Sequence, residues 1–208
     1  MWLIWKRIFT YINGFPADRS IWALELIIYA CLSNKNVTIL ISAAAFAAER
    51  HRMQRRKDVE NSPYINHPIA VAHVLAVEAG IEDVEVLAGA LLHDTIEDTD
   101  TTIGELRKIF GAAVAEFVGE VTDDKSLPKA ERKHLQIEHS SGLSTGAKLI
   151  KLADKICNLR DVRCTPPPDW SLERRREYFD WARQVIDGLR GTHDRLEALF
   201  DAEYAKRP

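Results

Sequence analysis

Helical periodicity is the feature that most constrains the fold of this chain. From residue 37 onward, apolar residues recur at intervals of three and four in nearly every segment. No stretch alternates apolar and polar residues for long enough to indicate a strand. The sequence therefore predicts an all-α fold, a helical bundle. With 208 residues, 46% of them hydrophobic, the chain is large enough for the core of one domain.

Capping residues, glycines and prolines indicate where these helices begin and end. The first is expected from residue 37, ending in the basic segment 55–58. Asn66 is expected to cap a second helix that contains Pro68 and stops at Gly80. Residues 84–93 are apolar almost all round, which predicts a buried helix. The remaining helices are predicted over 102–110, up to about 121, over 128–139 and 144–161, and twice after the prolines at 166–168.

The first 36 residues differ in composition from the rest. We expect residues 1–36 to be an N-terminal extension of unknown role and residues 37–208 to be the main domain. The apolar run over 21–32 is interrupted by Glu25 and is shorter than the ~18–20 residues that span a bilayer. We therefore predict no transmembrane segment. The extension could be an amphipathic segment that packs on the domain or touches a membrane surface, or a segment without a role.

Charge and cysteine content restrict the class of partner and the compartment. The formal net charge of −3 provides no general basic surface, so nucleic-acid binding is disfavoured and an anionic ligand needs a local cationic cluster. Cys31, Cys157 and Cys164 have no paired spacing, which disfavours a disulfide framework or a zinc knuckle. This usage suits a reducing cytoplasm. The oligomeric state is not indicated.

Several polar residues interrupt apolar helices. His93 and Asp94 end the buried helix, and an ionised carboxylate there is costly unless it is paired or binds a metal. Asp154 lies beside an apolar stripe with Asn158 one turn later, and His67 begins another helix. Each residue alone more often has a structural role. Together His67, His93, Asp94 and Asp154 predict a metal site whose mixed donors suit Mn, Fe or Zn better than Ca.

Three motifs resemble those of the HD hydrolase domain of the RelA/SpoT family, most closely its small stand-alone members. They are residues 64–68 (YINHP), 90–99 (ALLHDTIEDT) and 151–155 (KLADK). The resemblance extends from about residue 37 to near the C-terminus and includes residues 121–125, 158–161 and 178–179. It implies a metal-dependent phosphohydrolase in which the four ligands hold one manganese ion. Glu97 and Asp98 would be its catalytic acidic pair.

The acidic pair and the substrate contacts have simpler interpretations as well. Glu97 and Asp98 follow His93 and Asp94 by four residues, so a continuing helical turn would place them above the ligands. Without the neighbouring His93 and Asp94, Glu97 and Asp98 would instead be interpreted, with Asp100, as a solvated acidic loop. The resemblance further implies that Arg56 stacks on a guanine base and that Lys57 binds phosphate as a point charge. The other candidate substrate contacts are Asn158, Lys129 and Tyr178.

The resemblance implies a specific reaction. Pyrophosphate would be removed from the 3′ position of guanosine tetra- or pentaphosphate, leaving GDP or GTP and degrading the alarmone of the stringent response. The expected partner is thus a small guanine nucleotide. Hydrolysis of the NADPH 2′-phosphate or of another nucleotide is an alternative that the sequence barely distinguishes. An alarmone-binding sensor without activity is a further alternative, which the complete ligand set disfavours.

Overall fold

The computed structural model describes residues 19–208, with side chains described from Asn34 onward. Thr38–Pro208 form one compact unit, and helix α2 (Arg19–Arg50) begins in the segment before it. Residues 1–18 of the predicted extension lie outside the described range. No helix in the described part of the chain is both long and apolar enough to span a bilayer.

The prediction of an all-α fold is confirmed. The described residues contain no strand, and the only β pairing among them is an isolated antiparallel bridge between Arg55 and Pro63. The helices after α2 are α3 (Asn66–His73), the π-helix η2 (Val74–Ala79), α4 (Val84–Leu92), α5 (Thr95–Asp98), α6 (Ile103–Phe110), α7 (Ala112–Val121), α8 (Lys129–His139), the 3₁₀-helix η3 (Ser140–Gly142), α9 (Thr145–Cys164), α10 (Leu172–Asp187) and α11 (Asp194–Tyr204).

The predicted bounds of the first helix were wrong at both ends. Helix α2 begins at Arg19, long before residue 37, and ends at Arg50, before the basic segment. Beyond its end the chain folds back on itself, because the Arg56 amide donates to the Ser62 carbonyl (2.9 Å) and the Tyr64 amide to the Gln54 carbonyl (3.2 Å). These bonds replace the helical ones over residues 54–64, so Arg56 and Lys57 lie in a loop.

Polar side chains cap three of the helices whose starts the sequence predicted. Thr102, Ser144 and Ser171 each accept a backbone amide at the start of a helix. Gly80 ends η2 with φ 78°, a left-handed conformation that glycine adopts without strain. The assignment of Asn66 as a cap was wrong, because Asn66 is the first residue of α3 and no side chain caps that helix. A preceding turn already satisfies its amide, which donates to the Pro63 carbonyl (3.1 Å).

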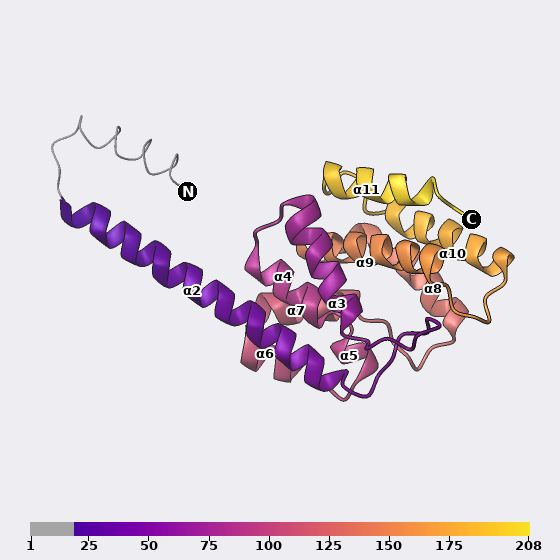
Figure 1. Cartoon of the computed structure of the whole chain (residues 1–208), viewed down its shortest axis with the longest axis horizontal. Coiled ribbons are helices and arrows are strands. Elements are labelled where there is room, and N and C mark those ends of the chain that lie inside the picture. The colour runs from indigo at the N-terminus through magenta and orange to yellow at the C-terminus, as the bar shows by residue number, and fades with distance from the viewer. Residues whose placement is uncertain (1–18) are drawn as a thin grey trace. The chain divides into compact units, whose positions relative to one another are not determined.

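Helix α9 is the centre of the compact unit. It contacts α3, α4 and α7 as well as α10 and α11, and Figure 1 shows it running between these two groups. Its buried apolar side chains include Ile150, Leu152, Ile156 and Leu159. Helix α4 is buried from Val86 to Leu92, as the sequence predicted. Asp154 therefore lies on the central helix α9, and His93 and Asp94 directly follow the buried helix α4.

Candidate metal centre

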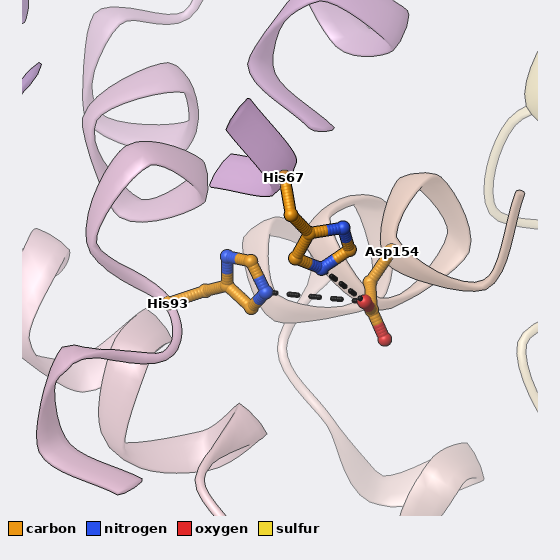
Figure 2. Close-up of side chains that lie close together, drawn as sticks. All are labelled: His67, His93 and Asp154. Atoms are coloured by element: carbon orange, nitrogen blue, oxygen red, sulfur yellow. Dashed lines mark hydrogen bonds and ion pairs between the residues drawn. The ribbon is translucent and has the colours of Figure 1, made fainter. Parts of the chain in front are cut away.

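Three side chains from three helices converge at the predicted metal site. His67 comes from α3, His93 follows α4 directly, and Asp154 comes from α9. Asp154 Oδ1 lies 3.1 Å from His67 Nε2 and 3.8 Å from His93 Nε2. Figure 2 shows both imidazole rings directed at this carboxylate. One ligand atom from each residue lies within 4.8 Å of the others, and all three residues are buried. This grouping can hold a metal ion.

Asp94 borders the same cluster. Its Oδ2 lies 3.0 Å from His93 Nε2 and 3.9 Å from His67 Nε2. The same oxygen accepts a hydrogen bond from the Tyr64 hydroxyl at 2.7 Å, which orients the carboxylate. The structure thus brings all four predicted ligands together.

The ring of His93 is oriented for coordination. Its Nδ1 donates to the Ala90 carbonyl at 2.8 Å, so in the neutral ring Nε2 carries the lone pair. That Nε2 is buried and has no hydrogen-bond partner within the described part of the chain, although Asp94 Oδ2 is close. A buried imidazole nitrogen without a hydrogen bond, facing carboxylates, is the donor that a divalent metal requires. The residues present therefore fit a divalent metal ion.

The electrostatics of the cluster also favour a cation. Burial lowers the pKa of His93, but Asp94 and Asp154 outweigh it and raise that pKa to about 9. Burial would raise the pKa of Asp154, yet Lys155 and His67 hold it well below its ordinary value. Both carboxyl groups therefore stay ionised and draw positive charge into the cluster. A divalent cation would take the place of the proton on His93.

The two predicted catalytic carboxylates have different surroundings. Glu97 lines a cavity of about 150 Å³ together with His67, His93 and Asp154. Burial and the nearby Asp123 and Asp94 raise the pKa of Glu97, against a hydrogen bond from the Asp123 amide. Asp98 does not line this cavity.

Asp98 is instead bound by neighbouring side chains. It accepts a hydrogen bond from Gln54 Nε2 at 2.7 Å and pairs with Lys125. Helix α4 ends before Asp94, and the single turn α5 starts at Thr95. The continuous helical turn assumed from the sequence is therefore interrupted between the ligands and the acidic pair.

Two predicted substrate contacts line the cavity. The Arg56 guanidinium donates to Asp161 Oδ2 at 2.5 Å and lies 5.4 Å from the centre of the Tyr64 ring. Asn158 donates to Asp154 Oδ1 at 2.5 Å. Arg56 lies in the loop before α3 and Asn158 lies on α9. Both side chains can contact a molecule that enters the cavity.

The other three predicted substrate contacts lie outside it. Lys57 and Lys129 are exposed. Partial burial lowers the pKa of Lys129, and so do the neighbouring cations Arg174 and Lys57, which indicates a local cluster of positive charge. Burial raises the pKa of Tyr178 to about 12, and its ring packs between Trp170 and Trp181.

Two lysines of the cavity wall had been given no role from the sequence. Lys155 Nζ lies 3.1 Å from Asp154 Oδ2, and Lys151 donates to the Val121 carbonyl at 3.0 Å. Both are buried and both line the cavity. Their signal in the sequence was the same as that of Asp154, since charged residues on the buried face of an apolar helix are costly without partners.

Comparisons with known proteins identify the family of the chain. Residues 43–180 match the model of the HD domain. The chain is 62% identical over 169 residues to the human (Homo sapiens) guanosine-3′,5′-bis(diphosphate) 3′-pyrophosphohydrolase MESH1, covering 81% of this chain and 94% of that protein. It is 56% identical over 173 residues to the zebrafish (Danio rerio) protein of the same name, covering 83% and 96%.

A solved structure is also similar. It is described as a metazoan ortholog of SpoT that hydrolyzes ppGpp and plays a role in starvation responses. The TM-score is 0.79 with 51% sequence identity, and the alignment covers 81% of this chain and 95% of that one. The chain therefore belongs to the HD-domain family, in the branch related to SpoT.

Proposed function

We propose that this chain is a metal-dependent guanosine-3′,5′-bis(diphosphate) 3′-pyrophosphohydrolase. The observation that carries the proposal is the buried cluster of His67, His93 and Asp154 with Glu97 in the wall of the same cavity. Relatives that are 62% and 56% identical bear the name of this enzyme. The substrate would be ppGpp or pppGpp, and the products GDP or GTP and pyrophosphate.

His67, His93, Asp94 and Asp154 would hold the metal. When bound, the ion would polarise the phosphoryl oxygens and make water a stronger nucleophile near neutral pH. Glu97 would orient the attacking water and accept its proton, for which its raised pKa is suited. The water oxygen would form a bond to phosphorus while the bond from phosphorus to the ribose O3′ breaks. O3′ would take up a proton, and pyrophosphate would leave.

Asp98 would support this step rather than perform it. Its contacts with Gln54 and Lys125 connect the loop before α3 to the segment after α7. We propose that it fixes the turn α5 on which Glu97 lies.

The substrate would be bound by cations at and around the cavity. Arg56, whose guanidinium already lies over the Tyr64 ring, would stack on guanine, and Asn158 would bind the ribose or a phosphate. Lys57 and Lys129 would attract the diphosphates from outside the cavity, where partial burial and then the charge of neighbouring cations lower the pKa of Lys129. Tyr178 is the remaining proposed contact.

A pyrophosphate-release assay on the full chain tests the function. We expect turnover of ppGpp with Mn²⁺ present, its loss on chelation and its recovery when Mn²⁺ is restored. Glu97→Gln should retain the metal and lose roughly 10²–10⁴-fold in kcat. Binding of ppGpp without release of pyrophosphate would contradict the proposal and favour a sensor. Parallel assays with NADPH and dNTPs would show whether another nucleotide is preferred.

We propose manganese as the native metal. Two imidazoles and two carboxylates form a mixed donor set that suits Mn²⁺, whereas Ca²⁺ prefers oxygen donors alone. Metal analysis of the purified protein, followed by reconstitution of the chelated protein with Mn²⁺, Zn²⁺ or Mg²⁺, checks the identity. Higher turnover with Zn²⁺ or Mg²⁺ than with Mn²⁺ would contradict it.

We further propose that residues 37–208 form the catalytic domain, that residues 1–36 are not needed for turnover, and that the enzyme acts in the cytoplasm. The HD-domain match begins at residue 43, which supports the first point. A variant without residues 1–36 should keep its kcat and its solubility.

Fractionation of cells that express the full chain should leave it in the supernatant, and its recovery with membranes would contradict the proposed cytoplasmic location.

A further inference from the structure

Helix α8 has no buried residue, yet two of its side chains reach toward the site. Arg132 Nη1 lies 3.7 Å from Glu97 Oε1 and 4.0 Å from Asp123 Oδ2. One turn later, Gln136 Nε2 donates to the same Asp123 oxygen at 2.6 Å. A helix without buried side chains contributes little hydrophobic stabilisation. These polar contacts link α8 to Glu97 and Asp123.

Both oxygens of Glu97 are engaged by this region. The Asp123 amide donates to Oε2 at 3.2 Å, and Arg132 approaches Oε1 from α8. Two carboxylates held this close would repel each other without a cation between them. Arg132 supplies that cation, since it lies within 4.0 Å of an oxygen of each.

The position of Arg132 indicates that it acts through Glu97. It does not line the cavity that contains the metal ligands. It lines a second cavity of about 210 Å³, which shares Asp123, Gln136 and Lys151 with the first. Its Nε is buried without a hydrogen-bond partner among the described residues. Because Arg132 lies outside the cavity of the metal ligands, it can orient the Glu97 carboxylate without touching a substrate held beside those ligands.

We propose that Arg132 is a positioning residue that holds the Glu97 carboxylate in its working orientation, with Asp123 and Gln136 as a second support. This inference rests on the proposed function, in which Glu97 accepts the proton of the attacking water. Loss of Arg132 would leave Oε1 free to rotate and bring Glu97 and Asp123 into direct repulsion. Displacement of a catalytic group by about 1 Å can cost on the order of 10²-fold in rate.

Steady-state kinetics on three arginine variants test the proposal. Arg132→Gln should lower kcat by roughly 10–100-fold and leave KM within about 3-fold, because the substrate contacts remain. Arg132→Lys should recover most of kcat because it keeps the charge. Arg175→Gln is the matched control, since Arg175 Nε is also buried without a hydrogen-bond partner in the described range but lies on α10, and it should leave kcat unchanged. The metal content of all three should equal that of the wild type.

The decisive measurement is a double-mutant cycle with Glu97→Gln. If Arg132 acts through Glu97, adding Arg132→Gln to Glu97→Gln should change kcat by less than about 3-fold. If the two losses multiply instead, Arg132 has an independent role and the proposal is overturned. If Glu97→Gln retains wild-type kcat, the role of Glu97 in the proposed function fails, which is a separate result.

A second variant covers the case in which Arg132→Gln does not fold. Gln136→Leu removes the hydrogen bond to Asp123 and leaves Arg132 in place. It should lower kcat with an unchanged KM, and this loss should also disappear in the Glu97→Gln background. An unchanged kcat in a folded, metal-loaded Gln136→Leu variant would overturn the second support. Unchanged kcat in Arg132→Lys and Arg132→Gln would overturn the role of Arg132.

Discussion

Three nitrogen atoms of different chemical character surround the carboxylate of Asp154. Oδ1 is approached by His67 Nε2 (3.1 Å) and by the Asn158 amide (2.5 Å), and Oδ2 lies 3.1 Å from Lys155 Nζ. Lys155 also lies 4.6 Å from the centre of the Trp181 ring, which gives its ammonium group a second partner. Oδ2 is thus neutralised by protein, and Oδ1 is the oxygen that faces both imidazoles.

From these contacts we expect Asp154→Ala to lose both metal and turnover. The substitution removes one donor of the cluster and leaves the buried Lys155 without its carboxylate, so it should also destabilise the fold by about 3–5 kcal/mol. Metal analysis, pyrophosphate release and thermal unfolding measure the three effects. Asp124→Ala, at an exposed carboxylate, is the control and should change none of them. Retention of metal by Asp154→Ala would mean that the ligand set is wrong.

Among the elements, the π-helix η2 is joined to the central helix α9 by an ion pair. A π-helix places more residues in each turn than an α-helix and so redirects the side chains that follow. Here Glu78 accepts two hydrogen bonds from Arg160 of α9, at 2.7 and 2.9 Å. Arg160 also donates to Glu203 of α11 at 3.2 Å. One guanidinium therefore joins three helices.

This ionic network predicts a loss of stability in acid. The hydrogen bonds from Arg160 lower the pKa of Glu78. Burial would raise the pKa of Glu203, but Lys206 and Arg160 lower it. Carboxyl groups with a lowered pKa in the folded state stabilise it above their unfolded pKa, near ~4.3, and this stabilisation is lost as the pH falls through the folded pKa.

Arg160→Met should accordingly lower the free energy of unfolding at pH 7 by about 1–2 kcal/mol, after allowance for solvent screening. Below about pH 4.5, its free energy of unfolding should depend less on pH than that of the wild type. Denaturant unfolding across this pH range measures both effects. Arg107→Met, which removes an exposed pair at 3.8 Å from Glu116, is the control. An Arg160→Met profile parallel to that of the wild type would contradict the prediction.

Close packing of α7 against α9 leads to another prediction. A Cβ added at Gly146 of α9 would lie 2.5 to 2.7 Å from three atoms of the Phe117 ring of α7, so the ring would have to move. We expect Gly146→Ala to cost about 1–3 kcal/mol through overpacking, more than alanine gains by its helix propensity. Thermal unfolding checks this expectation. Gly142→Ala, where an added Cβ meets nothing, should have little effect, and equal stability of the two variants would contradict the packing argument.

At the scale of the whole molecule, the proposed metal would tie together α3, α4 and α9, which are distant in the chain. A ligand that binds only the folded state stabilises it by ~4 kcal/mol at 1,000 times its dissociation constant. Chelation should therefore lower the unfolding temperature by several degrees, and added Mn²⁺ should restore it. In Asp154→Ala the chelator should have no effect. Equal unfolding temperatures of chelated and metal-loaded wild-type protein would mean that the metal does not connect these three helices.

Much of this architecture could be predicted from the sequence, for identifiable physical reasons. The helices with strong apolar periodicity and polar caps were predicted well, and so was the grouping of His67, His93 and Asp154, because charged and imidazole groups on apolar helices need partners. The start of α2 and the π-helix were not predicted, since apolar periodicity defines neither the ends of a helix nor its type. The contact of Arg132 with Glu97 depends on how the segment after α7 folds, which no local pattern encodes.

The hydrogen bond from His93 to the Ala90 carbonyl has a consequence for how the site tolerates mutation. In many metal sites a side chain orients the imidazole, and substitution of that side chain weakens the site. Here the acceptor is a main-chain oxygen in the last turn of α4. Every amino acid at position 90 would offer the same oxygen, so no single substitution deletes the acceptor. Substitutions at position 90 can therefore change the side chain there while the His93 ring keeps its tautomer.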